Sequence, residues 1–121
     1  MKKDFKPEII DFTVGDRDYT VEFTREALRE ADGLGVFSND SMGTLDRVTI
    51  ALYVGLKKNH PFITMRRARE ILDTAVDEGY SLDAFADVVD EMTRCYKAVF
   101  FNTDDSKKKL MVHRGAVKAQ K

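Results

Sequence analysis

The sequence predicts an α+β domain in which an N-terminal β-hairpin packs on three to four α-helices. The first observation is an alternation of apolar and polar residues on both sides of a short polar turn, within residues 9–24. The second is a series of later segments with helical spacing of apolar residues, several of them preceded by a serine or threonine. Because a lone hairpin is marginal in water, we expect helices of the same chain to cover its apolar face.

The two strands are expected near residues 8–14 and 19–24, joined by a four-residue turn, Gly15–Asp18. Placing Val14 opposite Tyr19 brings every apolar residue of the ribbon onto one face. The same register pairs the remaining apolar residues, Phe12 with Val21 and Ile10 with Phe23. The turn and the apolar pattern therefore agree on a hairpin.

Capping residues predict where three of the helices begin. Serine and threonine accept a hydrogen bond from a backbone N–H in the first turn of a helix, so they are favoured just before it. The helices predicted in this way are residues 25–32 after Thr24, residues 65–79 after Thr64 and residues 82–101 after Ser81.

A further helix is expected to begin between Ser41 and Thr44 and to run to about Lys58. Its apolar residues point almost all the way round, which is typical of a central helix that is buried on most sides. Gly55 inside it lowers helix stability by about 1 kcal/mol relative to alanine. We therefore expect a close backbone contact at Gly55.

A single domain is expected from the length of 121 residues. Residues 1–7 are expected to be a flexible N-terminus, residues 8–102 the α+β domain, and residues 103–121 a basic, mobile tail. The tail has six Lys and Arg against two Asp, a net charge of +4, which leaves −5 for the first 102 residues of a chain whose total is −1. No apolar run approaches the roughly 20 residues of a membrane span, and the start lacks the apolar segment of a signal peptide. We expect a cytoplasmic protein without membrane contact.

Residue types that carry catalysis or bind metals are few and scattered. His60 and His113 have no neighbouring ligands at metal-binding spacing, and we interpret them as a solvated loop histidine and a solvated tail histidine. Cys95 is the lone cysteine, and on the apolar side of its helix we interpret it as a small hydrophobe rather than a nucleophile. The sequence therefore predicts no enzyme activity, no cofactor and no metal site.

The last predicted helix, residues 82–101, is apolar over roughly half its circumference, which is wider than the ~100° stripe that a surface helix needs. One interpretation is that the whole width belongs to the core. The other is that the extra edge, extended by Phe101, is a docking surface for another protein or for a second copy of the chain. The candidate partner-binding residues of this second interpretation are Val88, Met92, Cys95, Val99 and Phe100.

The basic tail suggests an alternative function, a small nucleic-acid-binding accessory protein that holds phosphates through residues 103–121. The tail contains no aromatic residue on which bases would stack, and the rest of the chain is acidic. These two features disfavour nucleic acid as the partner.

The order of the segments also resembles a known family. "FTVGDRDYTVEFTREAL" is followed by "LDRVTIALYVGLKKNHPFITMRRAREILDTAVDEGYSLDAF". Between about Ile9 and Phe101 the chain is similar to the small tail assembly chaperones of tailed bacteriophages and prophages of Gram-positive bacteria. The features that match are a hairpin leading straight into "FTRE", a helix that ends before "HP", and a helix that ends in "DEG" before a serine-capped last helix.

The resemblance implies a non-enzymatic protein that binds the long tape measure protein during assembly of a flexible tail. Such a chaperone keeps its client soluble while tail tube subunits polymerise around it, and it is absent from the finished particle. The resemblance also implies self-association, and it makes the tail tube protein a further candidate partner. It carries no residue-level binding motif onto this chain.

Overall fold

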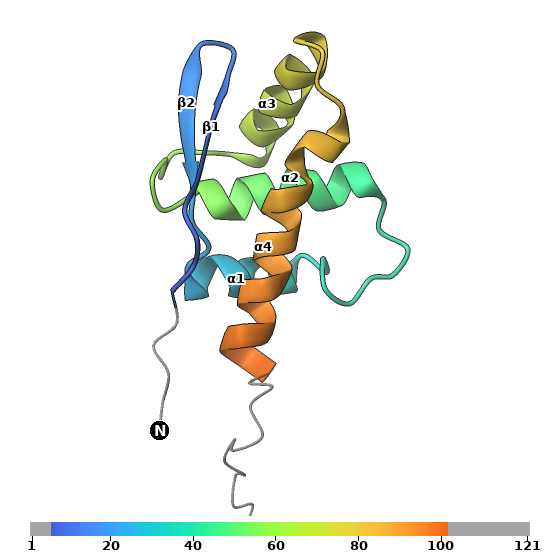
Figure 1. Ribbon diagram of the computed structural model, residues 1–121. Helices are drawn as coiled ribbons and strands as arrows, with labels where there is room; N and C mark the ends of the chain where they lie inside the picture. Colours follow the sequence, from blue (N-terminus) through green and yellow to red (C-terminus); the bar gives the residue numbers. More distant parts are fainter. Residues whose placement is uncertain (1–5, 102–121) are drawn as a thin grey trace, which may run out of the picture.

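The structure, a computed structural model, describes residues 6–101 of the chain (Figure 1). The predicted α+β class is confirmed, since a two-stranded antiparallel hairpin is followed by helices. Most of the expected N-terminal lead-in, residues 1–7, and the whole of the expected tail, residues 103–121, lie outside the described residues. The elements in chain order are β1 (Ile10–Val14), β2 (Arg17–Val21), α1 (Arg25–Gly33), α2 (Thr44–Leu56), α3 (Met65–Asp77), a 3₁₀ turn η1 (Leu82–Phe85), α4 (Ala86–Tyr96) and a π-helical turn η2 (Lys97–Phe101).

Helix α2 lies across the middle of the molecule, and α1, α3, α4 and β2 all contact it (Figure 1). Eight of its thirteen residues are buried, so the prediction of a central helix is confirmed. Leu52 and Leu56 are fully buried, and burial of such a side chain stabilises the fold by about 1.5–3 kcal/mol. None of the helices within residues 6–101 combines the length and the apolar character that crossing a membrane requires.

The hairpin turn is shorter than the sequence predicts, and the expected register is wrong. Gly15 and Asp16 have φ angles of 59° and 66°, so these two residues alone form a tight turn of the type that matches the twist of the strands. The observed register pairs Val14 with Arg17, Phe12 with Tyr19, and Ile10 with Val21. The shift of two residues leaves the apolar side chains on the predicted face, because side chains in a strand alternate with a period of two. Phe23 falls beyond the strand and is fully buried in the core.

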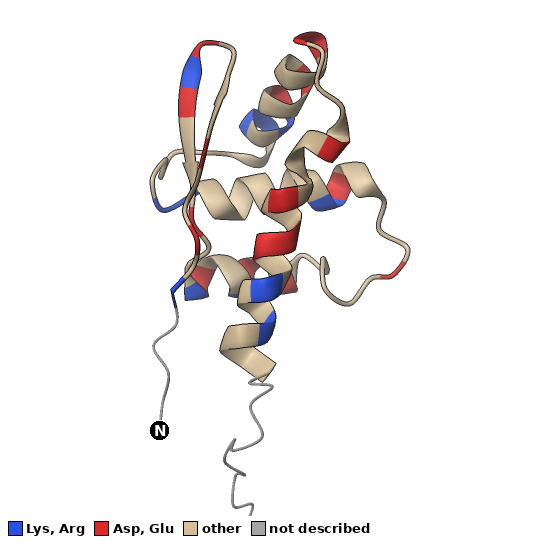
Figure 2. Ribbon diagram, in the orientation of Figure 1, with Lys and Arg blue, Asp and Glu red and all other residues tan. Residues whose placement is uncertain are grey.

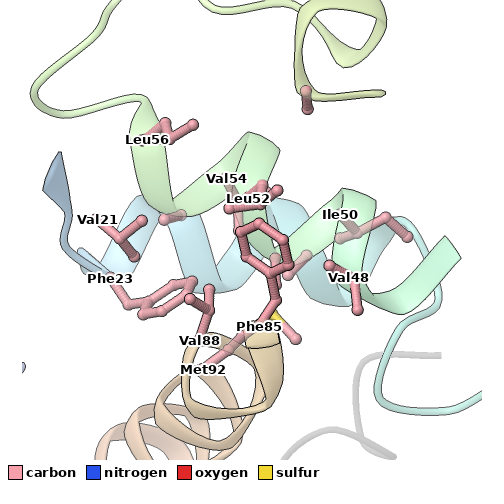
Figure 3. Packing of buried hydrophobic residues seen from close by; sticks show 14 of the residues in the cluster. Val21, Phe23, Val48, Ile50, Leu52, Val54, Leu56, Phe85, Val88 and Met92 are labelled. Carbon is pink, nitrogen blue, oxygen red and sulfur yellow. The ribbon is translucent and has the colours of Figure 1, made fainter. Parts of the chain in front are cut away.

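Gly55 of α2 is a point of close contact between the helix and the end of the hairpin, as its occurrence inside a helix predicted. A Cβ atom at Gly55 would lie 2.7 Å from Val21 Cγ1 and 2.9 Å from Phe23 Cε1. The Glu22 N–H donates to the Gly55 carbonyl over 2.8 Å. Figure 3 shows Val21 and Phe23 against the end of α2 near Leu56, with α4 packing alongside.

The helix starts depend on the predicted caps in two cases of three. Thr24 Oγ1 accepts from the Ala27 N–H, and Thr64 Oγ1 accepts from the Arg67 N–H, each over 3.0 Å. Ser81 makes no such bond, and the helix predicted over residues 82–101 is instead three consecutive segments. The break between η1 and α4 falls at Phe85, whose buried ring packs edge-on against Phe12 with centroids 5.7 Å apart. We attribute the break to the burial of this ring.

His60 is not the solvated loop histidine that the sequence suggests. It is half-buried, and its Nε2 accepts from the backbone N–H of Thr20 on the outer edge of β2 over 3.1 Å. Its ring lies 5.5 Å from the ring of Tyr19. His60 therefore accepts the hydrogen bond of the Thr20 N–H, which points away from β1. The other histidine, His113, lies outside the described residues.

We expect Gly55→Ala to lower the free energy of unfolding by about 1–3 kcal/mol, because the added methyl group overpacks the contact with Val21 and Phe23. Helix propensity alone would make the same change stabilising by about 1 kcal/mol, so the sign of the effect tests the contact. Urea unfolding followed by circular dichroism measures it.

Gly33→Ala is the matched control, because Gly33 also lies in a helix and has nothing within 4 Å of an added Cβ. This variant is expected to match or exceed wild-type stability, by at most about 1 kcal/mol. A Gly55→Ala protein at least as stable as wild type would show that the hairpin does not depend on this close approach.

Candidate partner-binding surface

Three of the five predicted partner-binding residues lie in the core. Val88, Met92 and Cys95 are 3%, 1% and 0% exposed, and Figure 3 shows Val88 and Met92 among the side chains packed against α2. This corrects the expectation that they form an exposed edge of the last helix. The physical reason is that α4 contacts both α2 and α1, so two neighbours cover an apolar width that one neighbour would leave open.

The other two predicted residues follow α4, in the π-helical turn η2. Val99 is half-buried and packs against the core, whereas Phe100 is 39% exposed. Phe101, the next residue, is 56% exposed. The accessible part of the predicted surface is therefore confined to the very end of the last helix.

This end carries a cluster of four aromatic rings that we call the aromatic end, formed by Phe37, Tyr96, Phe100 and Phe101. Phe37 comes from the loop between α1 and α2 and stacks on Tyr96 with centroids 3.6 Å apart and planes 7° apart. The centroids of Phe100 and Phe101 lie 5.7 Å and 5.3 Å from that of Tyr96. Tilted and edge-on pairs at the two longer distances attract one another beyond the burial of their area. Tyr96 contacts all three other rings and is therefore the centre of the cluster.

The π-helical turn is what brings Phe101 to this cluster. In a π-helix the hydrogen bonds join residues five apart, so residues at that spacing lie on the same side. Tyr96 and Phe101 are five apart, and their rings meet almost edge to face, with planes 65° apart. An α-helix would turn Phe101 away from Tyr96 by more than a right angle. The wide turn therefore adds the exposed ring of Phe101 to this end.

Charged groups of α1 lie at the border of the aromatic end. The Tyr96 hydroxyl donates to Asp32 Oδ1 over 3.1 Å, and partial burial together with this bond raises the pKa of Tyr96. The Arg29 guanidinium lies 6.0 Å from the centre of the Phe100 ring, within reach of a cation–π contact. Figure 2 shows positive charge where α4 passes into η2, from Arg94 and Lys97, and no charged residue on the remainder of η2. An apolar patch with a charged border is typical of protein-binding surfaces.

Cys95 belongs to a buried polar network rather than to a reactive site. Its thiol donates to Glu91 Oε2 over 3.1 Å, and burial, followed by this hydrogen bond to an anion, raises the pKa of Cys95 to about 12. The thiol is neutral near pH 7 and therefore a poor nucleophile. Cys95 is buried as the sequence suggests, but its hydrogen bond to Glu91 makes it more than the small hydrophobe expected there.

Glu91 is the centre of that network. Arg94 donates to both of its carboxylate oxygens over 2.8 Å, and the Glu8 N–H donates to Oε2 over 2.7 Å. Burial alone would raise the pKa of Glu91, but the hydrogen bonds from Arg94, Glu8 and Cys95 outweigh it, and the pKa lies below its ordinary value. The network ties the segment before β1 to α4.

Reactive groups do not converge at any point that the structure describes. Residues 6–101 contain no cluster of three or more His, Cys, Asp and Glu side chains at metal-binding distance. One surface hollow lies between α2 and α3 and another along the hairpin, and neither is lined by a histidine or a cysteine. The aromatic end is thus the feature of this part of the chain that most needs a functional explanation. Sequence reasoning missed Phe37, which lies in a loop without periodicity.

The lowered pKa of Glu91 predicts how the stability effect of Glu91→Gln depends on pH. Because the folded-state pKa is depressed, the ionised carboxylate stabilises the fold above the unfolded pKa of about 4.3, and this contribution is lost as the pH falls through the folded value. Glu91→Gln should cost about 1–3 kcal/mol at neutral pH and progressively less below about pH 4. Denaturant unfolding of both proteins across pH 7 to 3 measures the difference.

Glu70→Gln serves as the control for this change. Glu70 also pairs with arginine, over 3.2 Å to Arg67, but its side chain is about half exposed. Exposed pairs contribute roughly 0–1 kcal/mol, so this variant should change little at any pH. A pH-independent gap between wild type and Glu91→Gln would contradict the assignment.

The geometry of the aromatic end is the basis on which a function has to be argued. No known protein family, curated protein or solved structure was found to match this chain. The available arguments are therefore the exposed rings themselves, the charges beside them, and the order of segments in the sequence.

Proposed function

We propose that this chain is a non-enzymatic assembly chaperone that binds another protein through its aromatic end. The observation that carries the proposal is the pair of neighbouring exposed phenylalanines, Phe100 and Phe101, held on the stacked rings of Tyr96 and Phe37. Single exposed apolar residues are ordinary on protein surfaces, but a contiguous patch that leaves rings in water has a cost that a partner would remove.

The patch suits a helical client with an apolar face. Aromatic side chains supply large contact area with few rotatable bonds, which makes them frequent anchors in protein interfaces. Tyr96 is fixed by its stacking on Phe37 and by its bond to Asp32, so little ordering remains to be done on binding. An amphipathic helix that lays its apolar stripe on the rings would also meet Arg29 and Asp32 at the border.

The resemblance in segment order supports the tape measure protein of a phage tail as the client. That protein is long and helical and has to be kept soluble until the tail tube forms around it. A contact area limited to one end of a small domain gives weak, reversible binding, which suits a chaperone that is released and is absent from the finished virion. Under this proposal the protein acts in the cytoplasm of the bacterial host.

Co-expression of the tape measure protein with this chain tests the proposal. The variant Phe100→Asp/Phe101→Asp should reduce the amount of soluble, co-purifying client at least tenfold, because truncating central aromatic anchors typically costs 2 kcal/mol or more of binding energy. Circular dichroism and thermal unfolding show whether the variant keeps the wild-type fold, which is expected because both rings are substantially exposed.

Phe62→Asp is the matched control, because Phe62 is 94% exposed, lies between α2 and α3, and is not part of the aromatic end. It should solubilise the client as well as wild type does. If the folded double variant solubilises as much client as wild type, the aromatic end is not the client site and the proposal is wrong.

A further inference from the structure

The outer edge of β1 presents backbone groups that bind nothing in the part of the chain that is described. The Thr20 N–H points away from β1, since it donates to His60. Residues directly opposite each other in an antiparallel pair share their hydrogen-bonding direction, and Asp11 is opposite Thr20. The backbone groups of Asp11, and of Thr13 two residues on, therefore point away from β2. Within residues 6–101 these groups have no hydrogen-bond partner, and both residues are exposed.

The outer edge of β2, by contrast, is already occupied from Thr20 onward. His60 accepts from the Thr20 N–H, and the Gly55 carbonyl accepts from the Glu22 N–H. Figure 1 shows the hairpin standing beside the helices, with β2 joined to the segment that leads into α1. An additional strand can therefore pair along the whole of β1, whereas His60 blocks all of the β2 edge except the part near Asp18. When two copies pair through β1, each uses the edge that is open along its whole length. The assembly therefore stops at a dimer instead of growing into a fibre.

We propose that the occupant of this edge is β1 of a second copy of the chain, antiparallel, with Phe12 on the twofold axis. The alternation of apolar and polar residues in Ile10–Val14 is symmetric about Phe12, with β-branched residues at both ends. In this register Asp11 lies opposite Thr13 of the second copy, and Ile10 lies opposite Val14 of the second copy. The outward groups of Asp11 and Thr13 then form four backbone hydrogen bonds across the axis.

The side chains favour this register over its neighbours. Within the hairpin, Thr20 Oγ1 donates to Asp11 Oδ1 over 2.8 Å, and Thr13 Oγ1 donates to Asp18 Oδ1 over 2.7 Å. The proposed register repeats this Asp–Thr pairing across the new interface. A shift by two residues in one direction puts Asp11 opposite its own copy, and like charges directly opposite are destabilising. A shift in the other direction moves Asp11 opposite Gly15 and shortens the paired segment.

The apolar face of the sheet would continue across the interface. Phe12 is half-buried, stacks on Tyr19 with centroids 5.3 Å apart, and meets Phe85 edge-on. Residues in a non-hydrogen-bonded pair have the closest side chains, so the two Phe12 rings would cover each other's free edges. This pairing does not rest on the proposed function, because the β1 edge and the aromatic end share no residue.

Sedimentation velocity from about 5 µM to 1 mM tests the pairing, a range chosen because small interfaces give weak association. The full chain should shift from monomer to dimer, and Thr13→Pro should weaken the dimer at least tenfold, because proline removes an N–H that the hairpin itself does not use. Asp18→Pro is the matched control: it lies directly opposite Thr13, loses the same side-chain bond, and alters only the unused edge position of β2. It should change the dissociation constant less than about threefold.

Two further measurements keep the proposal falsifiable if a proline variant unfolds. Thr13→Lys, which faces Asp11 of the second copy, should tighten the dimer in a salt-sensitive way, and adding Asp11→Lys should reverse the gain. In the dimer the amides of Asp11 and Thr13 should exchange at least tenfold more slowly than in the monomer, while that of Asp18 should not. A monomer at every concentration, a dimer indifferent to charge at residue 13, or edge amides protected only when a client protein is added would each overturn the proposal.

Discussion

The contact between the end of the hairpin and Gly55 of α2 is the constraint on which the rest of the fold depends. Val21 and Phe23 fill the space that any larger residue at position 55 would occupy, and the Glu22 N–H binds the Gly55 carbonyl in the same place. Thr24 follows at once and caps α1, so the position of the contact also decides where α1 begins. A hairpin that is marginal alone becomes one wall of a core whose centre is α2.

That arrangement determines which part of α4 remains available. Because α2 is apolar on nearly all sides, α4 has to bury a wide stripe against it, and Val88, Met92 and Cys95 are used in this way. The hydrogen bonds of Glu91 also hold α4 against the segment before β1. Only the final turn extends beyond these neighbours, and there the rings of Phe100 and Phe101 remain in water. An exposed aromatic surface is left where the core ends.

Much of the fold was predictable because it is encoded locally. The alternation of apolar and polar residues predicted which face of the hairpin is apolar. Thr24 and Thr64 predicted the starts of two helices, and a glycine inside a helix, Gly55, predicted a close backbone contact. The register was not predictable from apolar pairing alone, since it depends on Gly15 and Asp16 adopting left-handed conformations together. The burial of α4 was missed because the number of helices packed against a face is a tertiary property. The π-helical turn was missed because the sequence was interpreted with the 3.6 residues per turn of an α-helix. That spacing does not predict the contact between Tyr96 and Phe101.

Native-state hydrogen exchange at the Glu22 amide tests the central contact most directly. If the hairpin and α2 form one cooperative unit, this amide exchanges only through global unfolding, and its opening free energy equals the unfolding free energy from denaturant within about 1 kcal/mol. An opening free energy lower by more than about 2 kcal/mol would mean that the hairpin leaves Gly55 while the helices stay folded. The account predicts the first result, and the second would contradict it.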